Sequence, residues 1–145
     1  MQEYPHLYIA TAKGQAEGII DTGSPGLENI AVMPPAEFDG PGDKWSPETM
    51  LVASVANCFI LTFRAVARGS RLDWNSLDVE VEGVLNRVER VTCFTEFRIK
   101  VLLRLPESAD WHKARRVAEK SEQVCLVTNS LSGDKKLDVD IEFDD

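Results

Sequence analysis

The clearest pattern in the chain is a strict alternation of apolar and polar residues along three segments of its second half. Apolar and acidic residues alternate over residues 77–82 and again over residues 137–143. Between these segments, one set of alternating positions is Cys93, Thr95, Phe97, Ile99, Val101, Leu103 and Leu105. A period of two is that of a half-buried β-strand. The pattern predicts an antiparallel hairpin from the first two segments, with Cys93 on its inward face, and a separate final strand.

The first forty residues also favour β-structure, in shorter pieces. Alternation at Tyr8, Ala10 and Ala12 precedes a Gly-containing turn at 14–18, and the apolar pair Ile19–Ile20 leads into a second turn at 23–26. A third apolar stretch at 27–32 ends at two prolines. Clusters of Gly and Pro between short apolar runs indicate turns between strands. We therefore expect three short strands before residue 35.

The segment from Met50 to Arg68 is apolar or small at nearly every position. Before it, Ser46 is a good N-cap residue, Pro47 suits the first helical position, and Glu48 complements the positive end of the helix dipole. A helix that is apolar on nearly every face is a buried one. One thin sheet in so small a chain does not cover all its faces, so we expect a second copy of the chain to do so, in a homodimer.

A second, amphipathic helix is predicted from Trp111 towards Cys125, capped by Ser108 or Asp110. A turn at Gly133 then leads into the last strand. The predicted order is β-β-β-α-β-β-α-β, with antiparallel strands grouped around one buried helix. This is an α+β fold, and the length of 145 residues predicts a single domain over residues 1–145.

Charge and composition exclude several classes of function. A net charge of −8 argues against nucleic acid and against anionic membrane surfaces as partners. We expect no transmembrane helix and no signal peptide, and hence a cytoplasmic protein. Three cysteines in such a protein do not indicate a structural disulfide framework, and two histidines without a Cys-x-x-Cys motif do not indicate a metal site. We also expect no cofactor, and the cysteines are left with either core packing or thiol chemistry.

Two segments resemble the signature motifs of one protein family, the OsmC/Ohr family. The first is Trp45-Ser46-Pro47-Glu48-Thr49-Met50-Leu51 followed by Ala56-Asn57-Cys58-Phe59, which is similar to the family's central helix, with a reactive cysteine ten residues after the glutamate. The second is Val124-Cys125-Leu126-Val127-Thr128-Asn129, which is similar to the family's second-cysteine motif. The order of elements and the length of the chain also fit.

The resemblance implies an OsmC-like fold, an intertwined homodimer and a thiol-dependent peroxidase that reduces organic hydroperoxides. Cys58 would attack the peroxide and become a sulfenic acid, and Cys125 would then close a disulfide. A dithiol reductant of the lipoyl type would reopen it. Glu48 would be the helix-opening carboxylate of the site. An apolar surround suits an alkyl or fatty-acid hydroperoxide.

The chain departs from the family at two positions. The family's peroxidases carry, in the turn after the first strand, an arginine that stabilises the thiolate, and Ala16 stands in its place. Arg64 or Arg68 of the same helix could substitute, but Arg64 lies six residues past Cys58 and roughly 240° around the helix, so it faces elsewhere. Without a cation, we expect the pKa of Cys58 to lie near that of a free thiol, about 8.5. The other departure is Leu126, where the family usually has proline.

Other interpretations stay open beside the peroxidase. The missing arginine favours a non-catalytic module that binds a lipid or a small apolar molecule at its dimer interface. A general thiol–disulfide protein is a third possibility, disfavoured by the lack of Cys-x-x-Cys. Cys58 and Cys125 are alternatively core fillers, Cys93 is expected to be plain core packing, and Glu48 is alternatively a residue that only complements the helix dipole.

Overall fold

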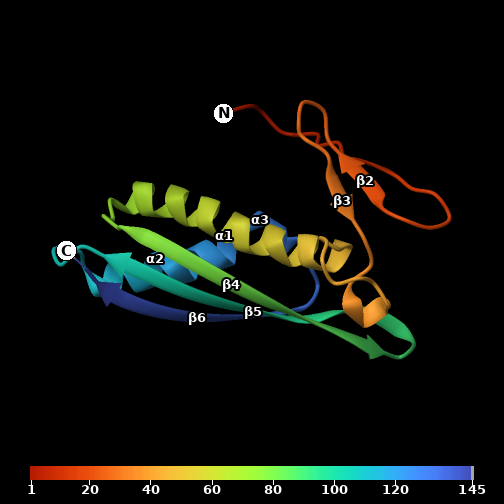
Figure 1. Cartoon of the computed structure of the whole chain (residues 1–145). Helices are drawn as coiled ribbons and strands as arrows, with labels where there is room; N and C mark the ends of the chain where they lie inside the picture. Colours follow the sequence, from red (N-terminus) through yellow and green to blue (C-terminus); the bar gives the residue numbers. More distant parts are fainter. Residues whose placement is uncertain (145) are drawn as a thin grey trace. The chain divides into compact units, whose positions relative to one another are not determined.

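The computed structural model describes residues 1–144 and consists of two compact units, residues 1–51 and residues from 52 onward. The first unit contains three short antiparallel strands in the order β1-β2-β3, followed by a single 3-10 turn, η1 (Figure 1). The strands are β1 (Thr11–Lys13), β2 (Ile20–Gly23) and β3 (Ile30–Val32), and η1 spans Ala36–Phe38. The three predicted strands are therefore confirmed. The assignment of all residues to one domain stays a prediction.

The long helix α1 (Pro47–Ser70) begins at the position that the sequence predicts. The Ser46 hydroxyl accepts a hydrogen bond from the Thr49 backbone N–H at 3.1 Å, and the Ser46 backbone N–H donates to the Thr49 hydroxyl at 2.9 Å. This reciprocal pair satisfies two backbone donors that the first turn of a helix leaves free. It fixes the start of α1 and therefore the position of every residue along it.

The second unit is built on a three-stranded sheet in the order β4-β5-β6. The strands are β4 (Ser76–Val88), β5 (Val91–Leu105) and β6 (Asp134–Phe143). The register sets the predicted apolar positions side by side, because Ile99 pairs with Val81 on one side and with Leu137 on the other. The acidic residues between them in β6, Asp138, Asp140 and Glu142, are exposed, as alternation requires.

The expectation of purely antiparallel strands is wrong for this sheet. β4 and β5 form the predicted antiparallel hairpin, but β6 runs parallel to β5. The reason lies in the connection: the chain leaves β5, passes through a helix, and returns to the same end of the sheet before entering β6. Such a helical crossover produces a parallel pair. The fold is α+β, with a mixed sheet.

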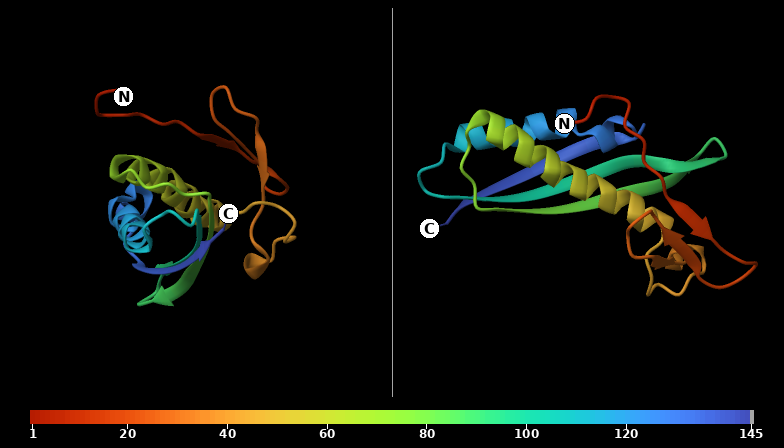
Figure 2. Two further views of the ribbon diagram at one scale, coloured as in Figure 1. Left: turned by 90° about the vertical axis from the view of Figure 1, so that its left-hand side faces the viewer. Right: turned by 90° about the horizontal axis from the view of Figure 1, so that it is seen from above.

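Both long helices lie on the same face of this sheet (Figures 1 and 2). They are α1 and α2 (Trp111–Val124), and the short helix α3 (Leu126–Asn129) follows α2 directly. Asp110 caps α2 by accepting hydrogen bonds from the backbone N–H groups of His112 and Lys113. The core between the helices and the sheet consists of fully buried side chains, the largest being Phe59, Phe63, Phe97, Ile99, Leu103 and Leu105.

Helix α1 is buried along one stripe. The buried positions Val55, Phe59, Phe63 and Ala67 are spaced by four residues, so they share one face, and Phe63 packs edge-on against Trp74 with ring centroids 5.1 Å apart. Length and composition alone would allow α1 to cross a membrane, with a mean hydropathy of 1.8, but its buried aromatic stripe is that of a core helix. Within the described chain the remaining apolar side chains are only partly covered; Leu61 is 60% exposed. The single chain thus does not supply the complete burial that the sequence predicts.

Gly83 in β4 lets α1 approach the sheet closely. A Cβ atom added there would lie 2.8 Å from Cγ2 of Val52 and 2.9 Å from Cε1 of Phe94. We expect Gly83→Ala to destabilise the protein by about 1–3 kcal/mol, because overpacking moves side chains or backbone. The matched control is Gly69→Ala in α1, where an added Cβ meets nothing within 4 Å. Urea unfolding measures both; equal stabilities of the two variants would contradict this packing.

Candidate active site

Cys58 lies on α1 at the margin of its buried stripe and is 9% exposed. One turn later on the same helix, the hydroxyl oxygen of Thr62 lies 3.8 Å from the Cys58 sulfur. Residues four apart on a helix face one another, which explains this contact. The sulfur is therefore largely shielded from bulk water and has a hydroxyl group as a fixed neighbour.

Cys125 lies where the chain passes from α2 to α3 and is 1% exposed. Its backbone is extended, with φ −65° and ψ 115°, so it ends α2 and serves as the N-cap residue of α3. Its carbonyl accepts hydrogen bonds from the Asn129 backbone N–H at 3.0 Å and from the Thr128 hydroxyl at 3.1 Å. This junction points the first backbone N–H groups of α3 towards the sulfur of Cys58.

The surroundings of Cys58 favour its thiolate. Burial is the largest influence and raises the pKa of the thiol. Hydrogen bonds to the sulfur more than offset burial and leave the pKa of Cys58 below its ordinary value; in decreasing order, they come from the Val127 backbone N–H, the Cys125 thiol, the Thr62 hydroxyl and the Leu126 backbone N–H. The expected pKa of about 8.5 stays a prediction, but the thiol is not unassisted. The sequence argument considered only cations and overlooked neutral donors.

The two cysteines differ in their ionisation. Burial is again the largest influence and raises the pKa of Cys125, opposed by the Thr128 backbone N–H and reinforced by the hydrogen bond to Cys58. The pKa of Cys125 consequently lies above its ordinary value. As the pH rises, Cys58 therefore loses its proton before Cys125, which keeps its own proton and donates it to the Cys58 sulfur. A thiolate is the nucleophilic form of cysteine, so Cys58 is the better nucleophile of the two.

Glu48 lies in the first turn of α1, ten residues before Cys58 on one continuous helix. At 1.5 Å per residue, the two positions are roughly 15 Å apart along the helix axis. The Glu48 Oε1 atom is buried and accepts no hydrogen bond from the described residues 1–144. A shielded carboxylate oxygen that accepts no hydrogen bond costs free energy of folding. The described part of the single chain therefore lacks a hydrogen-bond donor at this atom.

No arginine of α1 is among the groups that lower the pKa of Cys58. Arg64 and Arg68 are exposed, in agreement with the angular argument from the sequence. Ala16 is an exposed residue of the loop between β1 and β2. The described residues also contain no group of three or more His, Cys, Asp or Glu side chains that could hold a metal ion.

The expectation that Cys93 packs in the core is wrong, because its side chain is exposed. A register shift between Val84 and Leu85 changes the pairing of the hairpin, and Cys93 pairs with Asn86 beyond this bulge. Bulges bend and twist the strand that carries them. The apolar–polar alternation in the sequence continues beyond the part of the strand that is buried. A prediction from alternation therefore overestimates the burial of residues near the turn.

Mild oxidation tests the pairing of the thiols. We expect an intrachain disulfide between Cys58 and Cys125 that leaves Cys93 free, because the first two sulfurs are hydrogen-bonded and Cys93 is exposed elsewhere. Peptide mapping after treatment with a mild oxidant identifies the bridge. A bridge containing Cys93 would contradict the assignment.

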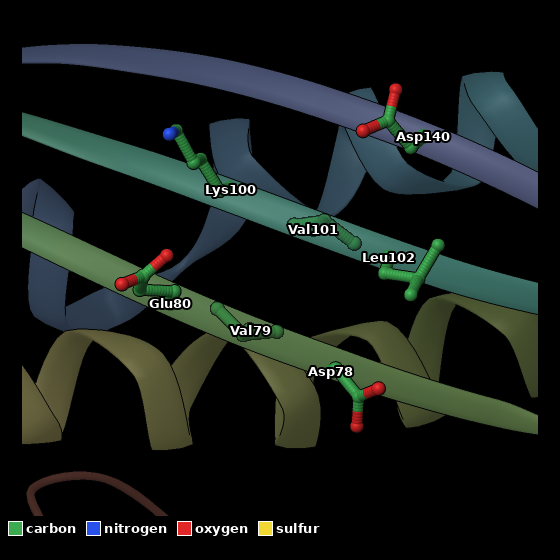
Figure 3. A pocket seen from close by; sticks show the side chains of 7 residues that line it. All are labelled: Asp78, Val79, Glu80, Lys100, Val101, Leu102 and Asp140. Carbon is green, nitrogen blue, oxygen red and sulfur yellow. The ribbon is translucent and has the colours of Figure 1, made fainter.

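A separate hollow of about 260 Å³ opens on the sheet, away from the two cysteines (Figure 3). Figure 3 shows Glu80, Lys100 and Asp140 around it, from three neighbouring strands. Charges of both signs alternate on this exposed face, and ion pairs such as Arg104–Asp78 at 2.9 Å join neighbouring strands. This arrangement is typical of a solvated sheet surface, and the hollow has no cysteine among its lining residues.

Sequence reasoning missed three contributors to the site: Thr62, Leu126 and Val127. Thr62 could have been found by the four-residue spacing from Cys58 on a predicted helix. Leu126 and Val127 contribute through their backbone N–H groups, so their side chains do not reveal this role. The role depends on the break between α2 and α3. Only the folded chain brings them to the sulfur.

Three comparisons with known proteins relate the chain to one family. Residues 40–140 match the sequence profile of the OsmC-like proteins. The chain is 29% identical over 126 residues to the uncharacterized protein YmaD of Bacillus subtilis, covering 85% of this chain and 82% of that protein.

Two solved structures have the same fold. One is an OsmC-like protein of unknown function from Vibrio cholerae, with a TM-score of 0.85 and 14% identity, covering 94% of this chain and all of that one. The other is an organic hydroperoxide resistance protein from Elizabethkingia anophelis, with a TM-score of 0.76 and 18% identity, covering 99% of this chain and all of that one. At these identities, the likeness establishes the fold.

Proposed function

Because the chain belongs to the family of OsmC-like proteins, we propose that it is a thiol-dependent peroxidase that reduces organic hydroperoxides with Cys58 and Cys125. The observation that carries this proposal is the pair of buried, hydrogen-bonded thiols with unequal acidity. Burial raises the pKa of both, but hydrogen bonds bring the pKa of Cys58 below its ordinary value, and that of Cys125 stays above it. A structural role as core fillers does not require four donors directed at one sulfur.

The proposed reaction has three steps. The Cys58 thiolate attacks the outer oxygen of the hydroperoxide, the O–O bond breaks, and the alkoxide leaves and takes a proton to become an alcohol. Cys58 is now a sulfenic acid, oxidised by two electrons. The Cys125 thiol attacks the sulfenic sulfur, which forms the disulfide and releases water. A dithiol of the lipoyl type then exchanges with this disulfide, restores both thiols and becomes a disulfide itself.

The burial of the resolving thiol beside Cys58 has a protective consequence. A sulfenic acid that meets no thiol is oxidised further to sulfinic acid, which is irreversible in most proteins. Since the two sulfurs are already hydrogen-bonded before reaction, the disulfide forms without a large movement of the chain. In a reducing cytoplasm, where we place the protein, this disulfide would exist only during turnover.

A second candidate is a non-catalytic module that binds a lipid or another small apolar molecule. It is favoured by Ala16, which offers no cation to the site, and by the buried Glu48 Oε1, which has no hydrogen-bond donor among residues 1–144. In that case, the thiols would stay reduced in the presence of peroxide.

One assay separates the two candidates. Purified protein is mixed with cumene hydroperoxide and dihydrolipoamide, and peroxide consumption is followed over time. The peroxidase account predicts catalytic consumption that needs both reagents and is slower with hydrogen peroxide. If the protein consumes peroxide no faster than dihydrolipoamide does without protein, the binding module is the better account.

We also propose that the protein is a homodimer. Leu61 on α1 and Leu126 at the start of α3 are 60% and 70% exposed in the single chain, although both lie beside the buried thiols in the sequence. We infer that these exposed apolar side chains belong to a patch that a second chain covers. We expect light scattering at micromolar concentration to give the mass of two chains; the mass of one chain would refute the dimer.

A further inference from the structure

The neighbours of the Cys58 sulfur are of one chemical kind. Every group that hydrogen-bonds to it is electrically neutral: two backbone N–H groups, one thiol and one hydroxyl. A cation usually provides this stabilisation for a reactive thiolate. Here the nearby arginines of α1 are exposed, and Cys125 is the titratable neighbour of the sulfur.

Two of these four donors are backbone groups and one is the Cys125 thiol, which takes part in the proposed reaction. Thr62 is therefore the side-chain donor that does not itself react. Its hydroxyl oxygen lies 3.8 Å from the Cys58 sulfur, within reach of a hydrogen bond to sulfur. With a neutral thiol, either atom can donate. With a thiolate, only the hydroxyl carries a proton, so Thr62 must be the donor. The contact is therefore stronger when Cys58 is ionised, because hydrogen bonds to charged groups exceed neutral ones.

The break after α2 provides the other two fixed donors. Cys125 is in an extended conformation, and the backbone N–H groups of the next two residues, Leu126 and Val127, lower the pKa of Cys58 as hydrogen-bond donors. A proline at position 126 would lack this N–H. Proline is otherwise well accommodated at the first position of a helix, so the leucine is not required by the geometry of α3.

We propose that Thr62 is a positioning residue of the site, whose hydroxyl, 3.8 Å from the Cys58 sulfur, stabilises the thiolate by donating a hydrogen bond to it in place of a cation. This inference deepens the proposed peroxidase function and rests on it for its importance to turnover. The arrangement resembles an oxyanion hole in its physics: preorganised neutral dipoles in a water-poor setting stabilise a negative charge.

The test measures the ionisation of Cys58 without any peroxide. The rate of alkylation of Cys58 by iodoacetamide is followed from pH 5 to pH 10 by peptide mass spectrometry, in the intact protein and in four variants. Thr62→Val removes the hydroxyl at nearly constant shape, and Thr62→Ala removes it with less bulk. Thr62→Ser keeps the hydroxyl, and Leu126→Pro removes one N–H. Circular dichroism reports the folding of each variant.

We expect Thr62→Val and Thr62→Ala to raise the pKa of Cys58 and to slow its alkylation at neutral pH by about three- to tenfold. Thr62→Ser should titrate like the natural chain. Leu126→Pro should shift the titration in the same direction as Thr62→Val, by less. Folded Thr62→Val and Thr62→Ala proteins that titrate like the natural chain would overturn the inference. If either variant fails to fold, the other decides.

The outcome is independent of the proposed function. If the peroxide assay fails but the Thr62 variants titrate as expected, the thiolate site stands and the peroxidase does not. If peroxide is reduced but the Thr62 variants leave the titration of Cys58 unchanged, the peroxidase stands and the role of Thr62 is refuted.

Discussion

A Cys58→Ser chain will consume organic hydroperoxide no faster than the uncatalysed mixture, a loss of roughly a thousandfold or more. Serine has nearly the same shape as cysteine, so the buried stripe of α1 stays intact, but a hydroxyl is not ionised at neutral pH and does not attack a peroxide. The measurement is consumption of cumene hydroperoxide with dihydrolipoamide as the reductant.

The chain provides its own control for this experiment. Cys93→Ser removes the exposed third thiol and should leave the rate unchanged. Cys125→Ser should reduce one equivalent of peroxide as Cys58 becomes a sulfenic acid, a second equivalent as it becomes a sulfinic acid, and then stop. Full activity in Cys58→Ser, or its loss in Cys93→Ser, would place the chemistry on another thiol.

Subunit complementation should restore activity to a mixture of two inactive proteins, a Glu48→Ala chain and a Cys58→Ser chain. Glu48 and Cys58 lie on one continuous helix, roughly 15 Å apart along its axis, so no contact joins them within one chain. Neither Gly nor Pro occurs between them to kink the helix. We therefore predict that Glu48 serves the Cys58 of the partner subunit in a symmetric dimer.

In the heterodimer, one site combines the intact Cys58 of one chain with the intact Glu48 of the other, and the second site lacks both. Heterodimers, made by mixing and partial unfolding and isolated by two affinity tags, should regain one of their two sites. Heterodimers as inactive as their parents would show that the site is not shared. Full activity of Glu48→Ala alone would leave Glu48 as a residue that only complements the helix dipole.

Much of the fold was predictable because local chemistry and tertiary packing agree. The N-cap at Ser46 follows from a capping rule, and the alternation along β4 and β6 follows from the period of a half-buried strand. The direction of β6 did not follow, because strand direction depends on how the crossover through α2 returns to the sheet. The exposure of Cys93 did not follow either, because a bulge in the hairpin has no signal in the alternation.

Of the proposed site, the sequence indicates only the two cysteines. Cys58 and Cys125 are identified by the resemblance of their flanking residues to a family, and the folded chain brings the two sulfurs together. The way in which Cys58 is made acidic was not predictable from side chains, since backbone N–H groups at positions 126 and 127 contribute. A sequence argument that looks only for a cation in place of Ala16 therefore overlooks these neutral donors.

The central claim is that Cys58 and Cys125 act together on an organic hydroperoxide, and a single-turnover experiment tests it most directly. Fully reduced protein is mixed with one equivalent of cumene hydroperoxide per chain without reductant, and the products are analysed by mass spectrometry. The account predicts one cumyl alcohol per chain and the loss of two hydrogen atoms from the protein, located at a Cys58–Cys125 disulfide. Intact peroxide and fully reduced thiols would contradict it.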